Sequence, residues 1–384
     1  MSSRWPEKYV IGLTGNIATG KSVVRKMLEH LGAFGLDADA LSHQAIAKGG
    51  PAYGPVVKAF GEWLLNDDGE INRARLARFV FADPEALARL ESLIHPVVGQ
   101  ALDFLVRRSK ASLAVIEAIK LIESGLGRDC DAVWVVHAHE PTQSARLVAK
   151  RKMTEAEARQ RIAVQAPQAD KLKAAQVVID NSGTFEDTWL RVQAAFNQIA
   201  LPTPLAAEAP AQPVTAPVEG KAIKVRRGKP TDATTIAAFI KQATRGARDL
   251  SRADVMAAFG DKAYLLADYD GQLAAIAGWK VENLVARVDE FYLATDAPMD
   301  KLSPPMFEAV ENASRELQSE AALVFVPMPI AQAAAQALAG SGFVPQTPDR
   351  LGVATWVEAA KESMPPGSAM LFKKLREDRV LRPI

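Results

Sequence analysis

The chain has 384 residues, 48% of them hydrophobic, and its 46 basic and 45 acidic side chains nearly cancel. This length exceeds one average core, so we expect two or three domains, and the charge balance gives no general electrostatic reason to bind nucleic acid or an anionic membrane. The single cysteine, Cys130, excludes an intrachain disulfide and a cysteine-based metal cluster. Because Met1 is followed by no apolar signal core, and no apolar stretch is long enough to span a bilayer, we expect a cytoplasmic protein.

A glycine-rich loop follows the first predicted strand, residues 9–13, and precedes a predicted helix that starts at Val23. The loop fits the template G-x-x-x-x-G-K-[ST] through Gly15, Asn16, Ile17, Ala18, Thr19, Gly20, Lys21 and Ser22. In such a loop backbone N–H groups surround a polyphosphate, the lysine reaches the terminal phosphates and the last hydroxyl binds Mg²⁺. The motif predicts a nucleoside triphosphate site. It leaves open whether the phosphate passes to water, to a small molecule or into mechanical work.

Two carboxylates follow the second predicted strand, residues 34–37, at the edge of a parallel sheet where ligands bind. Of Asp37 and Asp39, one could orient Mg²⁺ or the loop and the other could accept the proton of an attacking hydroxyl. The alternative is that one of them only caps the helix that follows. We interpret His43 and His95 as packing or hydrogen-bonding residues.

The region from about 40 to 110 is predicted to be helical, and Pro84 opens a long helix within it. Apolar residues recur in this helix at the spacing of one buried face, through Ala86, Leu87, Leu90, Leu93 and Ile94. Further strands are predicted at 113–117, 131–136 and 176–179. Strands separated by helices indicate a parallel sheet with right-handed crossovers, and the long helical insertion suits a lobe for the acceptor substrate.

A basic helical segment covers residues 146–165, and Thr154 with Glu157 forms a capping box that starts its second helix. Helices with this many cations suit a lid that closes over phosphates, because guanidinium groups stabilise the charge of a transferring group. An ordinary solvated basic face is the alternative. The phosphate loop earlier in the chain favours the lid.

Prolines and alanines dominate residues 202–221, which we interpret as a semi-extended linker between a domain at 1–201 and a second domain at 222–384. The second domain begins with a strand near 223 and a helix, and residues 263–279 form two strands around the turn Asp270-Gly271. The expected order then continues with a strand at 288–293, a helix at 302–318, a strand at 323–326, a helix at 331–339 and a strand at 369–372.

The first 200 residues resemble bacterial dephospho-coenzyme A kinase in an ordered set of motifs. These are the phosphate loop, Leu36–His43, Gly49–Tyr53, Phe60-Gly61, Asp68–Arg73, Val80–Pro84, Ile94–Pro96, Arg146-Leu147, Arg161-Ile162 with Gln165, and Val178–Gly183. The resemblance implies an α/β P-loop kinase that transfers the γ-phosphate of ATP to the ribose 3′-hydroxyl of dephospho-coenzyme A. That transfer is the last step of coenzyme A synthesis.

The resemblance also implies residue roles. Asp39 would be the catalytic base, Lys21 would hold the β- and γ-phosphates, and Arg146 with Arg161 would stabilise the transferred charge. The metal ligands would be Ser22 and, less firmly, Asp37. The nucleotide would contact residues 15–23, which include Val23, as well as Arg161 and Asn181 near the adenine.

The sequence departs from the family at a few positions. Asn16 and Ala18 stand where glycines are usual, and an alanine held at positive φ would be strained. In the segment 117–123 both terminal carboxylates are kept, as Glu117 and Glu123, but Ile119 replaces a proline and Lys120 an apolar residue. Lys120 could alter how the acceptor is held.

The element order of residues 222–384 resembles the GNAT-type acetyltransferase fold. The cofactor loop of that family should fall between 294 and 306, where this chain has no glycine and three prolines: Pro298, Pro304 and Pro305. Pyrophosphate recognition by backbone amides needs close approach and free N–H groups, which prolines lack. We therefore expect a catalytically silent interaction or sensing module.

Three other functions remain open for the whole chain. A nucleoside or nucleotide kinase would use a similar loop and lid, and a bifunctional protein would add acetyl transfer by the second domain. A pseudo-kinase scaffold is the third alternative, which the intact Lys21, Ser22 and Asp39 disfavour. The sequence leaves the oligomeric state open.

Overall fold

The computed structural model describes residues 4–165, 167–201, 214–218, 221–295, 297–328, 331–377 and 380. By packing, the chain forms two compact units. The first comprises Met1–Leu36, Lys110–Lys280 and Tyr292–Pro298, and the second comprises Asp37–Ser109, Val281–Phe291 and Met299–Ile384. Within the described ranges, no helix is both long enough and apolar enough to cross a bilayer.

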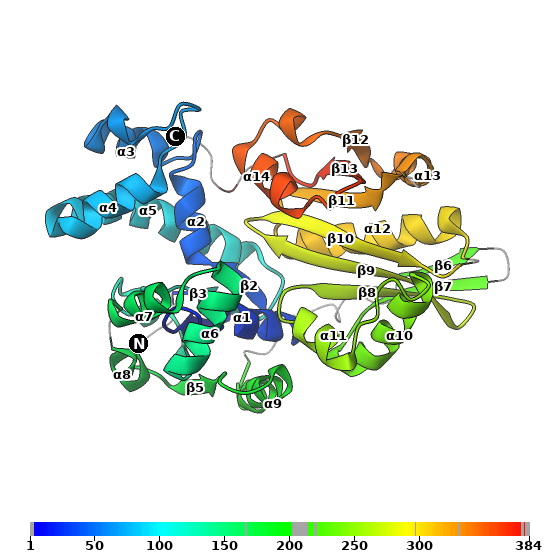
Figure 1. Cartoon of the computed structure of the whole chain (residues 1–384), viewed down its shortest axis with the longest axis horizontal. Helices are drawn as coiled ribbons and strands as arrows, with labels where there is room; N and C mark the ends of the chain where they lie inside the picture. The colour runs from blue at the N-terminus through cyan, green and yellow to red at the C-terminus, as the bar shows by residue number, and fades with distance from the viewer. Residues whose placement is uncertain are drawn as a thin grey trace. The chain divides into compact units, whose positions relative to one another are not determined.

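The first sheet has five strands in the order β2-β3-β1-β4-β5. Figure 1 labels β2, β3 and β5 of this sheet. Its strands are β1 (Tyr9–Thr14), β2 (Phe34–Asp37), β3 (Leu113–Glu117), β4 (Ala132–His137) and β5 (Val177–Asp180). The pairings of β1 with β3 and β4, and of β4 with β5, are parallel. The prediction of a parallel sheet is confirmed, and each predicted strand matches within one residue at either end. The central position of β1 brings the loop that follows it to the middle of the carboxyl edge.

Helices accompany this sheet. They are α1 (Lys21–His30), η2 (Leu126–Asp129), α6 (Glu140–Arg151), α7 (Glu155–Ala163), α8 (Gln168–Lys173) and α9 (Phe185–Phe196). Of these, α1 and α9 bury an apolar face against the sheet. Val24, Met27 and Leu28 of α1 and Val192 of α9 join the strand residues in one buried core. The predicted capping box at Thr154 and Glu157 is confirmed at the start of α7.

The predicted helical insertion is present in the second unit. It comprises α2 (Ala38–Ala45), α3 (Tyr53–Phe60), η1 (Glu62–Leu64), α4 (Arg73–Ala82) and α5 (Pro84–Arg108). Pro84 is the first residue of α5, as predicted, where its missing N–H has no intrahelical partner to lose. On the predicted buried face of α5, Ala86 and Ile94 are buried, while Leu87, Leu90 and Leu93 are half-buried.

The second sheet has eight strands in the order β12-β13-β11-β10-β9-β8-β7-β6. They are β6 (Val214–Val218), β7 (Lys221–Arg227), β8 (Ala263–Tyr269), β9 (Gln272–Glu282), β10 (Val285–Leu293), β11 (Ala321–Pro327), β12 (Val344–Gln346) and β13 (Ser368–Lys374). The predicted turn between β8 and β9 is confirmed, and both Asp270 (φ 56°) and Gly271 (φ 79°) lie in the left-handed region that such a hairpin needs. Strand β6 lies inside the expected linker, of which 202–213 and 219–220 are outside the described residues.

The second sheet is accompanied by α10 (Ala233–Ala243), α11 (Arg252–Ala258), α12 (Met299–Glu316), α13 (Ala331–Leu338), α14 (Ala354–Ser363) and the short turns η3 (Pro230–Asp232), η5 (Ala339–Ser341) and η6 (Pro348–Arg350). The helix expected from about 302 to 318 is present as α12, but it starts three residues earlier, at Met299, and contains Pro304 and Pro305. The free amides of a helix are those of its first turn, so these two prolines remove intrahelical bonds and not ligand-facing donors. The argument against a pyrophosphate site therefore depends on the missing glycines and on Pro298.

Candidate active site

The phosphate loop joins β1 to α1 and is shaped by two glycines. Gly15 has φ 153°, and a Cβ there would lie 2.4 Å from the carbonyl oxygen of Val136 on β4. Gly20 has φ 92°, and its Cβ would lie 2.1 Å from Nδ2 of Asn181. Both distances are far below van der Waals contact, so the loop needs glycine at these two positions.

The two departures from the family differ in their consequences. Ala18 adopts φ 56°, the left-handed region that costs an L-residue about 1–2 kcal/mol, so the strain expected from the sequence is present. Asn16 is not among the described residues with positive φ. Its carbonyl oxygen instead accepts from Thr19 Oγ1 at 2.9 Å and from Lys21 Nζ at 3.2 Å. In this structure the Lys21 ammonium is therefore hydrogen-bonded to the backbone of the phosphate loop itself.

A buried polar cluster lies at the first turn of α1. The Ser22 hydroxyl donates to Oε1 of Glu117 at 2.9 Å, and Arg25 Nε donates to Oε2 of the same carboxylate at 2.8 Å. Glu117 is the last residue of β3 and only 4% exposed. In the sequence, Glu117 stands out only as a retained carboxylate. Its position at the carboxyl end of a strand beside β1 was the signal that could have identified it as a site residue.

The oxygens of Ser22 and Glu117 suit Mg²⁺. Magnesium prefers hard oxygen ligands and is usually bound by one or two protein groups together with substrate phosphates and water. A dedicated cage of three or more His, Cys, Asp or Glu side chains is not found among the described residues. A hydroxyl and a carboxylate at the phosphate loop fit a metal that arrives with a nucleotide.

Arg146 and Asn181 clamp the phosphate loop from α6 and from the turn after β5. Arg146 Nη1 donates to the carbonyl oxygens of Ala18 and Thr19, each at 3.2 Å, and its Nη2 donates to that of Asn181 at 2.7 Å. Burial lowers the pKa of the Arg146 guanidinium. The Asn181 amide donates to Thr19 O at 2.7 Å and accepts from Thr188 Oγ1 at 2.8 Å. In this structure both side chains therefore hold the loop backbone.

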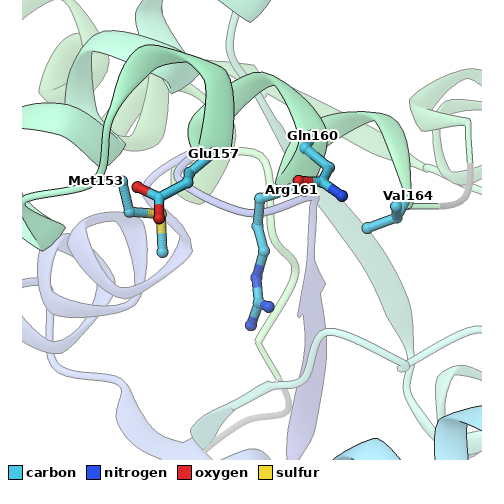
Figure 2. A pocket seen from close by; sticks show the side chains of 5 residues that line it. All are labelled: Met153, Glu157, Gln160, Arg161 and Val164. Atoms are coloured by element: carbon cyan, nitrogen blue, oxygen red, sulfur yellow. The ribbon is translucent and has the colours of Figure 1, made fainter.

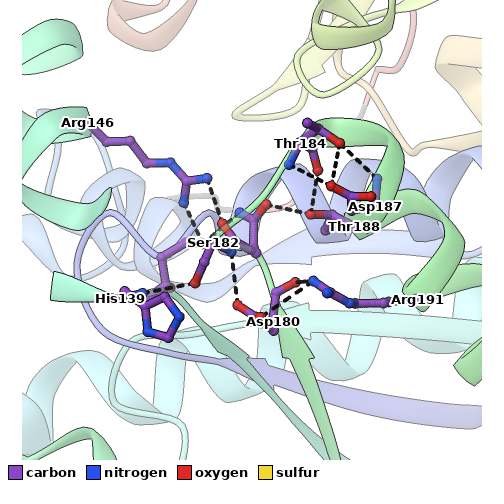
Figure 3. Close-up of polar contacts among 10 residues, drawn as sticks. His139, Arg146, Asp180, Ser182, Thr184, Asp187, Thr188 and Arg191 are labelled. Atoms are coloured by element: carbon purple, nitrogen blue, oxygen red, sulfur yellow. Dashed lines mark hydrogen bonds and ion pairs between the residues drawn. The ribbon is translucent and has the colours of Figure 1, made fainter. Parts of the chain in front are cut away.

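The turn after β5 is fixed by a dense set of hydrogen bonds (Figure 3). Asp180 accepts from the Ser182 backbone N–H at 3.0 Å, and Ser182 Oγ accepts from the His139 N–H at 3.0 Å. Hydrogen bonding to Ser182, together with nearby Arg191, lowers the pKa of Asp180. Thr184 and Asp187 then form a capping box at the start of α9. This rigid turn supports Asn181 beneath the loop.

Helix α7 and the phosphate loop enclose a small apolar cluster. Ile17 and Ala18 of the loop pack with Leu147, Ala158, Met153 and Ile162. Beside this cluster lies a cavity of about 430 Å³ lined by Met153, Glu157, Gln160, Arg161 and Val164. Figure 2 shows Arg161 extending from α7 into this cavity. The predicted lid therefore packs against the loop and presents one of its two proposed arginines to a cavity.

Asp37 and Asp39 lie at the start of α2. Asp37 is the N-cap residue, and its Oδ1 accepts from the Ala40 N–H at 2.8 Å. This bond is the capping function that the sequence left as an alternative for one of the two carboxylates. Asp39 lies in the first turn of α2 and is half-buried. Burial and Arg73 lower the pKa of His43 in the same helix, while Asp39 opposes the shift.

Comparison with known proteins finds sequence relatives of the first half of the chain, and solved structures that are similar to parts of it. The sequence model of the dephospho-CoA kinase family matches residues 9–187. The dephospho-CoA kinase of Geobacter sulfurreducens is 43% identical over 187 residues, which are 48% of this chain and 95% of that protein. The solved structure of dephospho-CoA kinase from Campylobacter jejuni is 23% identical, with a TM-score of 0.37, and the match covers 50% of this chain and 96% of that one. A putative acetyltransferase from Salmonella typhimurium is 11% identical, with a TM-score of 0.31, over 41% of this chain and 95% of that one.

Proposed function

The chain belongs to the dephospho-CoA kinase family, and on this premise we propose how its residues carry out the reaction. The family activity is transfer of the γ-phosphate of ATP to the 3′-hydroxyl of dephospho-coenzyme A, which completes coenzyme A. The observation that supports it best in this chain is the intact phosphate loop, with Ser22 hydrogen-bonded to the buried Glu117.

In the proposed reaction, Asp39 accepts the proton of the acceptor hydroxyl as its oxygen attacks the γ-phosphorus. The bond between that phosphorus and the bridging oxygen breaks, and ADP leaves. Lys21 and the backbone amides of residues 15–23 hold the phosphates. Arg161 extends from α7 into the cavity and is suited to stabilise the charge of the transferring group.

Arg146 is proposed to act chiefly by holding the loop, because its guanidinium binds three backbone carbonyl oxygens. Asn181 supports the loop in the same way. Mg²⁺ would be held by Ser22 and Glu117, and when bound it would neutralise charge on the phosphates. Asp37 is a weaker candidate for the metal, since one of its oxygens already caps α2.

The acceptor distinguishes this function from that of a nucleoside or nucleotide kinase. Purified protein with Mg²⁺ and ATP should phosphorylate dephospho-coenzyme A far faster than adenosine or nucleoside monophosphates, in a coupled assay for ADP release. Equal or faster turnover of a nucleotide acceptor would contradict the assignment.

We propose that residues 1–201 carry the kinase activity alone. In support, the relative from Geobacter sulfurreducens is matched over 95% of its own length by less than half of this chain. A protein ending at Leu201 should therefore keep its activity. A shortened protein that gains activity only when residues 222–384 are added in trans would contradict this proposal.

For residues 222–384 we propose a non-catalytic module, because the segment 295–305 contains no glycine. We also propose that the protein is cytoplasmic and that it binds neither nucleic acid nor a membrane. Acetyl transfer by the full chain to an amine, with acetyl-coenzyme A as donor, is the result that would overturn the non-catalytic assignment.

A further inference from the structure

Three polar side chains that follow α7 reach the carboxyl edge of the first sheet. They are Gln165, Gln168 and Lys171, spaced three residues apart. Gln165 Oε1 accepts from the Ile17 N–H of the phosphate loop at 2.7 Å, and Gln168 Nε2 contacts His137 Nδ1 at the end of β4. Lys171 reaches the segment after β3. The chain after α7 therefore contacts the loop after β1, the last residue of β4 and the segment after β3.

Lys171 is the most deeply buried of these three residues, with 4% exposure. Its Nζ donates to the carbonyl oxygen of Ile119, lies 3.5 Å from Thr14 Oγ1 and pairs with Glu123 Oε1 at 3.2 Å. The Thr14 hydroxyl donates to the same Ile119 carbonyl at 3.1 Å. A buried ammonium is costly unless oxygens replace its water, so these contacts hold the head group in one place.

The Ile119 carbonyl matters because it lies two residues after Glu117. Between them, the Ala118 N–H donates to Leu13 O at 3.0 Å, so the backbone leaving β3 is fixed on both sides. Glu117 is the carboxylate that accepts from Ser22. A shift of the Ile119 peptide would therefore turn the residue that aligns the hydroxyl at the start of α1.

We propose that Lys171 is a positioning residue for phosphoryl transfer: by fixing the Ile119 carbonyl, it keeps Glu117 aligned with Ser22. In this proposal Lys171 acts through Glu117 and not by contact with a substrate. This inference rests on the proposed role of Ser22 and Glu117 in holding Mg²⁺. The competing interpretation is that Lys171 only anchors α8, in which case its loss would affect stability and leave the folded enzyme fully active.

The test compares Lys171→Met with Lys173→Met in the full chain. Lys173 lies on the same helix, pairs with Asp170 at the surface and has a side chain that is 78% exposed. Lys171→Met should lower kcat about 10-fold or more and change the KM for dephospho-coenzyme A by less than about 3-fold, because alignment of the metal ligands and not acceptor binding is lost. By calorimetry, the gain in ATP affinity on replacing EDTA with Mg²⁺ should shrink several-fold. Lys173→Met should match the unaltered protein in both measurements.

Two further variants keep the proposal testable if Lys171→Met folds poorly. Thr14→Val removes the other donor to the Ile119 carbonyl and should cause a smaller loss of the same kind, in kcat and not in the KM for dephospho-coenzyme A. Glu123→Gln removes the ion pair but not the carbonyl contact and should keep near-normal kcat. Normal kcat in Lys171→Met and Thr14→Val, or an equal loss of kcat in Glu123→Gln and Lys171→Met, would overturn the proposal.

Ser22→Ala separates this proposal from the assignment on which it rests. The variant should abolish most of the magnesium-dependent gain in ATP affinity. If Ser22→Ala keeps that gain, the metal assignment is wrong. If it loses the gain while Lys171→Met keeps it, the positioning role of Lys171 is wrong.

Discussion

Asn181 and Thr19 are joined by a 2.7 Å hydrogen bond from the asparagine amide to the threonine carbonyl, which ties the turn after β5 to the phosphate loop. The contact explains why Gly20 follows Thr19, since a Cβ at Gly20 would meet the same amide nitrogen at 2.1 Å. Asn181 is 3% exposed, and its other side-chain atom accepts from Thr188. A buried amide with both ends bonded fixes the loop in one conformation.

Asn181→Asp should therefore weaken ATP binding and lower stability. The replacement keeps the shape but exchanges the donor for an oxygen that faces the Thr19 carbonyl. A buried group left unpaired costs about 1–3 kcal/mol, and more when it is charged. The check is ATP titration calorimetry together with thermal unfolding. Gln198→Glu adds the same charge at an exposed position and should change neither result, and normal ATP affinity in Asn181→Asp would count against the clamp.

The sequence predicted the first half of the fold well because its signals are local. Neighbouring residues alone predict the apolar strand before the glycine loop. They also predict the start of α5 at Pro84, and both elements were placed correctly. Long-range contacts gave no such signal. The pairing of Ser22 with Glu117 joins residues 95 positions apart, and that of Arg146 with the loop joins residues more than 120 positions apart. Their partners could not be read from spacing alone.

The second half was less predictable. Helices α11 and α14 and strand β12 were not expected, and α12 starts at Met299, three residues before its expected start. Residues 214–218 lay in a stretch assigned to the linker from its prolines and alanines. Edge strands and short helices derive much of their stability from tertiary packing, which composition does not report.

Ala18→Gly should stabilise the protein by up to about 1.5 kcal/mol. Relief of the left-handed conformation is worth about 1–2 kcal/mol, and the added freedom of glycine in the unfolded chain subtracts about 0.4–1 kcal/mol. Denaturant unfolding measures the difference. Ala149→Gly, at an exposed position in α6, should instead destabilise by about 1 kcal/mol, because that alanine is in ordinary helical conformation. Equal destabilisation by both variants would contradict the strain at Ala18.

Cys130 should be almost unreactive in the folded protein at pH 8. Burial raises the pKa of its thiol to about 12, with Asp129 and Asp131 adding to the shift. The thiolate is the nucleophile, so at pH 8 its fraction should be roughly 10³-fold below that of an unperturbed cysteine of pKa about 8.5. Iodoacetamide labelling followed by mass spectrometry measures the rate. The same chain unfolded in guanidinium is the control, and comparable labelling of both forms would show that the thiol is not protected.

Asp39 and Asp37 can be separated by substitution because Asn caps a helix as well as Asp does. Asp39→Asn removes a proton acceptor and should lower kcat by about 10²-fold or more while ATP affinity stays nearly constant. Asp37→Asn should preserve the cap on Ala40 and stability, so any loss of activity in that variant would report a role for the charge of Asp37.

Asp37→Ala provides the matched control, since it removes the cap as well and should cost about 1 kcal/mol of stability. Steady-state kinetics, ATP calorimetry and thermal unfolding of the three variants give each residue its own pattern. If Asp37→Asn abolishes turnover while Asp39→Asn keeps it, the base has been assigned to the wrong carboxylate. If both keep full activity, neither carboxylate accepts the proton.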